Sequence, residues 1–438
     1  LGLVVAILLF IRNREAGPFA IGWAALVLLV CFLPSTLKLA NNLAGTGSES
    51  IWLYRGGVFL IECVLVVFVV RMLLTWNSGG RPIYFLLAAA CLSLMFATKE
   101  TAFITAGTML IACSCIRLWR KIYSPAIAES GKDEIDDHEI SWGNLTSAFG
   151  SRSDAILTIV AAAFVFLYVS IVFFSSFFTY SEGIGKALEA YAIWTKTGSR
   201  DHTQNGMLAY LDWGLATEAP LLILAAIGTL IAFFKSRHRF AMFASLWAFG
   251  LFLAYTIIPY KTPWLAISFL LPMCIVGGYA VNELVGSRET WKLYTGIFLG
   301  VAGGLVLAYQ TFDLNFVRYD DEDTPYVYAH TQRAFHDLIR QIEHYAEKSG
   351  KGTATKIQIV SPDYWPLVWY LRDYKEANFH GRVVEDQNAE MIIAKKGEQD
   401  AEVTSRFASK YERVGSYALR SGVELVLLVR KDLADTKH

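Results

Sequence analysis

The 438-residue sequence lacks an excess of charge of either sign, because its 39 basic side chains balance 39 acidic ones. A balanced chain offers no electrostatic footprint for DNA or RNA, so we expect no nucleic-acid partner. The sequence also lacks a phosphate-binding glycine loop, a nucleophile elbow and a dinucleotide fingerprint. These absences disfavour the chemistry of soluble nucleotide-dependent enzymes.

Cysteine is scarce, and the six that occur all lie in hydrophobic stretches without a zinc spacing. They read as small apolar side chains, and neither a disulfide nor a metal site is predicted from them. Histidines near the C-terminus also lack the three- or four-residue spacing of a paired helical metal site. The residues concerned are Cys31, Cys63, Cys91, Cys113, Cys115 and Cys274, and His330, His336 and His344.

Hydrophobic residues, in contrast, make up 54% of the chain, and aromatic residues make up 14%. Because a bilayer is crossed by about 20 apolar residues, this composition predicts a membrane protein. The fold class is a polytopic α-helical membrane domain over residues 1–311, followed by a soluble α/β domain over 312–438. Ten apolar segments are predicted: Leu1–Ile11, Ile21–Ala40, Ile51–Val70, Ile83–Ala97, Ala102–Trp119, Ala155–Phe178, Ala219–Phe234, Phe240–Ile258, Trp264–Val285 and Tyr294–Thr311.

Connections rich in arginine and lysine alternate with connections poor in them, which predicts a topology. The basic connections, assigned to the cytosol, are Arg12 with Arg14, Arg71 to Arg81, Arg117 to Arg152, Lys235 to Arg239, and Arg288 with Lys292. The outward connections are Asn41–Ser50, Lys99–Glu100, Tyr180–Glu218 and Pro259–Pro263. We therefore expect a multi-pass protein of the cytoplasmic membrane whose C-terminal domain is extracytosolic.

Two long connections and one buried acid carry further expectations. Within Tyr180–Glu218, the apolar positions Ile184, Leu188, Tyr191 and Trp194 predict a helix that lies along the membrane. The cytosolic stretch Lys121–Ser153 shows no apolar period and reads as a solvated linker. Glu62 falls inside a predicted span, where a contact between helices is the favoured interpretation.

The C-terminal domain shows alternating helical and strand patterns. Acidic residues Asp320–Asp323 and Pro325 predict the start of a helix over Tyr326–Glu347. Strands are expected at Lys356–Val360, Met391–Ala394 and Glu424–Val429, with a helix between the last two. An aromatic helix over Tyr364–Tyr374 is expected to bury its rings in the core rather than to present a sugar platform. These aromatic side chains are Tyr364, Trp365, Trp369 and Tyr370.

Charged residues at two outward turns are candidates for chemistry. For Lys99 and Glu100, a lysine reaching the membrane surface beside an acidic partner is as good an explanation as a phosphate contact with an acid, base or metal role for Glu100. For Lys261, flanked by Tyr260 and Trp264, an ordinary interfacial belt is the bland alternative. Two such turns on one face favour a site.

The outward loop adds Asp201 and His202, which follow Arg200 and supply a carboxylate and an imidazole next to a cation. Taken singly, each reads as a solvated loop residue. Their place on the same predicted face as the two lysine turns makes His202 a candidate catalytic residue.

Four separated motifs resemble one known group, the relatives of protein O-mannosyltransferases known as flippase-activity-associated proteins of archaeal N-glycosylation. They are FATKETAFI at Phe96–Ile104, IPYKTPWL at Ile258–Leu265, TPYVYAHT at Thr324–Thr331 and DYWPLVWYLRDY at Asp363–Tyr374. The wider superfamily, the GT-C membrane glycosyltransferases, implies a GT-C-like fold. It also implies transfer of a sugar from a polyprenyl-phosphate donor to an acceptor on the outer membrane face.

The resemblance implies roles for residues at the outward turns. Glu100 and His202 are the candidate catalytic residues, and Lys99 and Lys261 are the candidates for binding the donor phosphate. Such enzymes place their principal acid in the first outward loop, which we expect upstream of Leu1, because the run Leu1–Ile11 resembles half of a span. The candidate substrate contacts are Tyr210, Tyr260 and Trp264.

Three functions from different classes fit these observations. The leading prediction is a glycosyltransferase whose partners are a polyprenyl-phosphate sugar, a protein or glycan acceptor and membrane lipids, with a divalent cation left open as a cofactor. A membrane component that assists flipping or assembly of lipid-linked glycans without catalysis is the second. A secondary transporter is third. Transporters commonly have internal repeats and a site near the middle of the bilayer, whereas this sequence shows no clear repeat and its charged and aromatic residues gather at the outer surface.

Overall fold

The computed structural model describes residues 1–12, 15–45, 50–76, 81–127, 142–197, 206–235, 238–327, 330–385 and 388–435. It divides into two compact units, Leu1–Leu307 and Ala308–His438. The division falls inside the last long helix, four residues before the boundary at 311/312 that the sequence predicts. Each unit is described by itself below.

The first unit is helical throughout its described length. Its elements are α1 (Gly2–Ile11), α2 (Pro18–Ala44), α3 (Ile51–Thr75), α5 (Pro82–Thr98), α6 (Ala102–Ile127), α7 (Trp142–Ala148), α8 (Arg152–Phe174), α9 (Gly183–Thr197), α10 (Ala209–Thr217), α11 (Ala219–Lys235), α12 (Arg239–Ile257), the 3-10 turn η3 (Pro263–Ala266), α13 (Ile267–Val285) and α14 (Thr290–Phe312).

Seven of the described helices are long and apolar enough to cross a membrane, or eight if α10 and α11, bent by 108°, form one span. Each of the ten predicted apolar segments contains a helix, but α1 and α5 are shorter than a usual span. Large apolar side chains face outward, among them Phe68 of α3 and Phe164 of α8. Because such exposure is unfavourable in water, the first unit is suited to lipid, and the prediction of a multi-pass membrane protein is confirmed.

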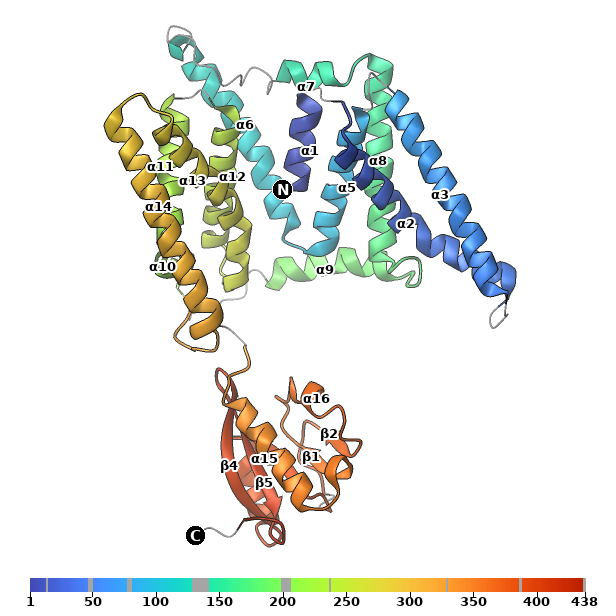
Figure 1. Ribbon diagram of the computed structural model, residues 1–438, viewed down its shortest axis with the longest axis vertical. Helices are drawn as coiled ribbons and strands as arrows, with labels where there is room; N and C mark the ends of the chain where they lie inside the picture. The colour runs from blue at the N-terminus through green and yellow to red at the C-terminus, as the bar shows by residue number, and fades with distance from the viewer. Residues whose placement is uncertain are drawn as a thin grey trace. The chain divides into compact units, whose positions relative to one another are not determined.

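The helix ends separate into two groups at opposite ends of this unit (Figure 1). α2, α5 and α12 end, and α3, α6 and α13 begin, at the same end as α9, and we call this the Lys99 end. α1, α3 and α13 end, and α2, α5 and α14 begin, at the same end as α7, and we call this the α7 end. The alternation expected from the charges is thus present in the fold, while the side facing the cytosol stays a prediction.

The stretch expected to be a solvated linker contains the short helix α7, so that expectation is wrong for residues 142–148. Leu145 and Phe149 pack against Phe10 of α1, with the rings of Phe10 and Phe149 5.0 Å apart. Too few apolar residues occur there to reveal a helical period in the sequence. α7 lies across the end of the helices and covers α1.

Close helix packing in this unit depends on glycine. A Cβ atom at Gly228 of α11 would lie 2.3 Å from the carbonyl oxygen of Val276 in α13. A Cβ at Gly296 of α14 would lie 2.7 Å from Leu284 Cβ. Small residues let helix backbones approach in an apolar environment, where packing replaces the hydrophobic effect as the driving force. Glycine therefore fixes α11, α13 and α14 against one another.

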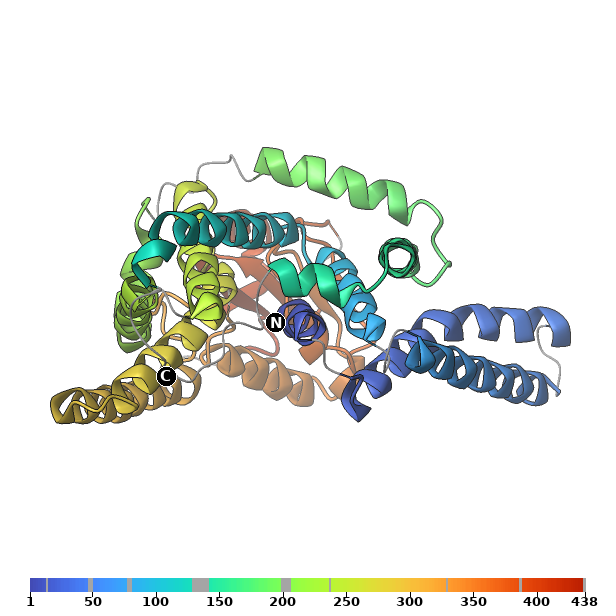
Figure 2. The same ribbon diagram turned by 90° about the horizontal axis from the view of Figure 1, so that it is seen from above.

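The predicted helix along the membrane is α9, which extends across the Lys99 end and is seen lengthwise from above, where α8 is seen end-on (Figure 2). Its approach begins with three non-glycine residues at positive φ, Ser176, Phe177 and Phe178. Such left-handed backbone is costly for L residues and needs support from its surroundings. A Cβ at Gly183 would lie 1.9 Å from the Phe174 carbonyl oxygen, so only glycine fits where the chain turns into α9.

The second unit is an α/β domain around one sheet. After the last turns of α14 and a π-helical segment η4 (Asp313–Val317), it contains α15 (Phe335–Lys348), the 3-10 turn η5 (Gly352–Ala354), β1 (Ile357–Ile359), α16 (Leu367–Tyr370), β2 (Ala377–Phe379), β3 (Met391–Lys395), α17 (Gln399–Phe407), β4 (Tyr411–Arg420) and β5 (Val423–Arg430). The strand order is β2-β1-β3-β5-β4. Strand β1 pairs in parallel with β2 and β3, whereas β5 is antiparallel to β3 and β4.

Both faces of this sheet are covered, as alternation along β5 shows. Leu425, Leu427 and Val429 pack with α15, while Val426 and Leu428 pack with α17. Because successive strand residues point to opposite faces, one strand contributes to both cores. The three predicted strands and the helix between the last two are confirmed, and β2 and β4 were missed.

The predicted helix start at Tyr326 is wrong, because α15 begins nine residues later at Phe335. The acidic run instead binds side chains that precede the helix. Asp320 forms an ion pair with Arg333, which lowers the pKa of Asp320 to about 2. Asp320 is thus stabilised by the guanidinium of Arg333 and not by the N-terminal end of a helix, as the sequence suggested.

Candidate functional site

The turn between α5 and α6 places Lys99 and Glu100 at the Lys99 end. Lys99 caps α5 in an extended conformation, and its carbonyl accepts a hydrogen bond from Ala102 N at 3.1 Å. The Lys99 side chain is exposed and that of Glu100 is half-buried. Desolvation lowers the pKa of the Lys99 ammonium, and the adjacent Glu100 opposes this effect. The turn therefore presents an accessible cation beside a carboxylate.

Helix α9 lies directly beside this turn. The Tyr191 hydroxyl donates to the Phe96 carbonyl at 2.9 Å, and Trp194 contacts Phe103 with ring centroids 5.1 Å apart. Phe96 and Phe103 belong to the same motif as Lys99 and flank it on either side. Aromatic residues with one polar end suit the boundary between lipid and water. The lysine turn is thus bordered by an aromatic layer at the expected depth of lipid headgroups.

The second turn, between α12 and η3, holds Lys261 differently. Its ammonium donates to the carbonyl oxygens of Tyr255 at 2.8 Å, Thr256 at 2.7 Å and Ile258 at 2.5 Å. Only 3% of Lys261 is exposed. An ammonium has three hydrogens, and the end of a helix leaves carbonyls without partners. Lys261 therefore caps α12 from within the turn, and its burial lowers its pKa.

Tyr210 of α10 completes this turn. Its hydroxyl donates to the Thr262 carbonyl and accepts from the Thr262 amide, both at 3.1 Å. Its ring also lies 5.5 Å from the Lys261 ammonium. The structure thus brings together two residues that are 51 positions apart in the sequence, but it buries both. Their geometry is that of a rigid scaffold.

The remaining predicted residues differ in accessibility. Trp264 is exposed, and Tyr260, four residues earlier in the chain, is half-buried. His202 and Asp201 lie outside the described residues. Trp264 is therefore the aromatic side chain of this turn that a ligand can reach directly.

Both turns belong to the same end of the first unit because their helices pack together. α6 begins after Lys99, α12 ends before Lys261, and a Cβ at Gly250 of α12 would lie 2.7 Å from Thr108 of α6. The two helices run antiparallel, so the first turn of α6 and the last turn of α12 lie at one level (Figure 1). Lys99, Glu100 and Trp264 therefore lie at the same end of the first unit.

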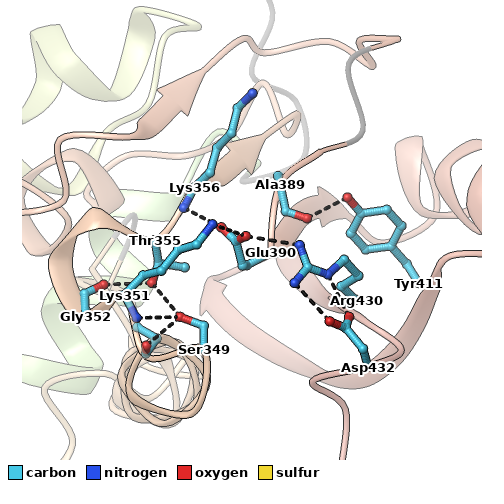
Figure 3. Close-up of polar contacts among 11 residues, drawn as sticks. Ser349, Lys351, Gly352, Thr355, Lys356, Ala389, Glu390, Tyr411, Arg430 and Asp432 are labelled. Atoms are coloured by element: carbon cyan, nitrogen blue, oxygen red, sulfur yellow. Dashed lines mark hydrogen bonds and ion pairs between the residues drawn. The ribbon is translucent and has the colours of Figure 1, made fainter.

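A buried carboxylate in the second unit escaped the sequence analysis. Glu390 is 0% exposed and accepts hydrogen bonds from Lys351 Nζ at 2.8 Å, Lys356 N at 2.8 Å and Arg430 Nη1 at 3.1 Å (Figure 3). Burial alone raises the pKa of Glu390, but these donors outweigh it and the net shift is downward. Its partners are far apart in the sequence, so no spacing could reveal them. Both oxygens are occupied, as in a structural ion cluster.

The aromatic motif of the second unit is only partly core. Tyr364 and Tyr370 pack against the core as expected, but Trp365 and Trp369 are 64% and 63% exposed, so the expectation is wrong for both tryptophans. The guanidinium of Arg372 lies 4.7 Å from the Trp369 ring. The four aromatic residues lie within seven consecutive positions, and the helix there has a single turn, so the side chains cannot all face inward.

Potential metal ligands do not cluster in the described part of the chain, where no group of three or more His, Cys, Asp or Glu side chains could hold an ion. All six cysteines are free thiols. Compared with family models, with curated proteins and with solved structures, the chain matches none. The family resemblance therefore rests on the four motifs alone.

Proposed function

We propose that this protein transfers a sugar from a polyprenyl-phosphate donor to an acceptor hydroxyl at the Lys99 end, on the outer face of the cytoplasmic membrane. The observation that carries this proposal is the exposed Lys99 beside Glu100, bordered by α9. The polyprenyl chain of the donor would stay in the apolar region, so its phosphate would lie at the depth of lipid headgroups. A cation at that depth suits such a phosphate. The four motifs that resemble GT-C glycosyltransferases supply the reaction class.

The two turns take different parts in this proposal. Lys99 binds the donor phosphate and stabilises the charge that grows on it as the bond to the sugar breaks. Glu100 takes the proton from the attacking hydroxyl. Trp264 offers a ring face to the sugar, and Tyr260 lies next to it. Lys261 and Tyr210 hold the second turn in shape rather than contact the phosphate.

The test is a transfer assay with the purified chain, a radiolabelled polyprenyl-phosphate sugar and a crude acceptor fraction from the cell envelope. We expect Lys99→Ala to reduce transfer about a hundredfold, because one electrostatic contact to a transition state is worth about that much. Lys186→Ala, which removes an exposed lysine of α9, is the matched control and should retain transfer. Equal rates for Lys99→Ala and the unchanged chain would overturn the assignment of Lys99.

Glu100→Gln gives the complementary test, with Glu182→Gln as its control at the start of α9. If Glu100 moves a proton, its replacement lowers the rate of transfer and leaves donor binding in place. Donor binding without any transfer, in the unchanged chain and with several sugars, would instead favour a non-catalytic component that handles lipid-linked glycans.

A further inference from the structure

A cavity of the first unit lies away from the Lys99 end. It has a volume of about 650 Å³ and opens between α1, α6, α7 and α12. This volume falls within the range of about 300 to 1,000 Å³ that is typical of sites for small molecules. Nothing in the proposed transfer reaction uses it, so its lining has to be explained separately.

The lining divides sharply into an apolar slot and a basic mouth. Ile7 of α1, Met109 of α6 and Phe243 of α12 are typical of the apolar walls. Among the described residues that line the cavity, the charged ones are Arg117, Arg120 and Arg239. All three arginines lie toward the α7 end of their helices. The cavity is therefore matched to a ligand with an apolar body and an anionic head.

The length of the slot indicates what kind of ligand it can bind. Ala106 and Arg120 both line it and lie 14 residues apart on α6, which corresponds to about 21 Å at 1.5 Å per residue. One leaflet contributes about half of a hydrocarbon core of about 30 Å. The slot is therefore long enough for one acyl chain of a lipid from the leaflet at the α7 end together with part of its headgroup.

The ring of Trp142 completes the mouth. It also lines the cavity, and the guanidinium of Arg117 lies 5.5 Å from its centroid. Tryptophan at a membrane interface, together with arginines between helices, is a combination that binds anionic lipid headgroups. α7 thus holds one side of the headgroup site in place.

We propose that this cavity is a binding site for an anionic glycerophospholipid of the leaflet at the α7 end, whose phosphate is held by Arg117, Arg120 and Arg239 and one of whose acyl chains fills the slot. The site is separate from the Lys99 turn and does not rest on the proposed transfer reaction. A bound lipid joins α1, α6, α7 and α12, which otherwise leave an open space.

The test is native mass spectrometry of the full chain in detergent with three added probes: phosphatidylglycerol, phosphatidylcholine with the same acyl chains, and a polyprenyl monophosphate. We expect phosphatidylglycerol to bind most tightly. The double variant Arg117→Gln, Arg120→Gln should weaken this binding about thirtyfold, since each basic residue near an anionic lipid contributes about 1 kcal/mol. The control Lys235→Gln, Lys292→Gln removes two cations from the same end outside the cavity and should bind normally.

Equal weakening in both double variants, or equal binding of phosphatidylcholine, would overturn the proposal. Tighter binding of the polyprenyl monophosphate would replace the phospholipid with another ligand and would overturn it as well. A second measurement needs no variant, because Cys113 lines the cavity and Cys115 is exposed. Phosphatidylglycerol should slow alkylation of Cys113 by N-ethylmaleimide and leave that of Cys115 unchanged, whereas equal slowing of both would count against a bound lipid in the slot.

Discussion

At the scale of single residues, the two lysine turns look alike in the sequence and differ in the structure. Both place a lysine between apolar helices and near aromatic residues. Lys99 is exposed, while Lys261 folds back onto three carbonyls at the end of α12. Both lysines are candidate phosphate ligands because of their place in outward turns and the family resemblance, but neither shows whether a flexible side chain will cap its own helix. That choice depends on the backbone path of Pro259–Pro263.

This difference predicts opposite effects of replacing the two lysines. Lys261→Met should destabilise the helical unit by about 2 to 4 kcal/mol, because it leaves buried carbonyls of α12 without donors. Lys99→Met removes an exposed side chain and should change stability by less than about 0.5 kcal/mol. The measurement is the thermal unfolding temperature of each variant in detergent. Matching losses of stability in the two variants would show that Lys261 is not the cap described above.

At the scale of the elements, the apolar segments were predictable because spanning a bilayer imposes a length and a composition on every helix. The short helix α7 was not, since its position depends on contacts with Phe10 that no local pattern reports. Likewise, β4 has an irregular register against β5 around Gly415, and its apolar residues do not alternate cleanly. The length and periodicity of apolar residues therefore predict spanning helices and regular strands. They do not predict elements whose position depends on tertiary packing.

Glycine contacts between helices give the prediction at this scale. Gly228→Ala should destabilise the packing of α11 on α13 by about 1 to 3 kcal/mol, because the new Cβ would meet the Val276 carbonyl. Gly278→Ala in α13 is the matched control, since a Cβ there meets nothing within 4 Å. Alanine favours a helix over glycine, so the control should be neutral or slightly stabilising. Unfolding temperatures of both variants measure the difference.

At the scale of the whole molecule, the chain consists of two units with separate cores, and each has its own source of stability. The membrane environment and glycine packing support the first unit, while the second depends on its sheet and on the Glu390 ion cluster. The order of the units was predictable from composition, because apolar helices give way to alternating helix and strand signals. The cluster was not, since Lys351, Glu390 and Arg430 meet only once the sheet has formed.

Separate cores predict separate responses to acid. The pKa of Glu390 is lowered by folding, so its contribution to stability is present above its unfolded pKa of about 4.3 and is lost as the pH falls through the lower folded value. Glu390→Gln should therefore destabilise the second unit by about 3 kcal/mol at neutral pH and reduce its acid sensitivity. Hydrogen exchange, resolved by peptide, should show loss of protection in β3 and β5 with α11 and α13 unchanged.

The two exposed tryptophans, Trp365 before α16 and Trp369 within it, also have a consequence for handling the protein. Each indole keeps a large apolar surface in water, and burying such a surface releases about 25 cal/mol for every Å² removed from solvent. Burying Trp365 and Trp369 together against another apolar surface would therefore be favourable by several kcal/mol. Even in detergent that covers the helical unit, self-association through these two indoles is expected, and replacing both with serine should reduce it.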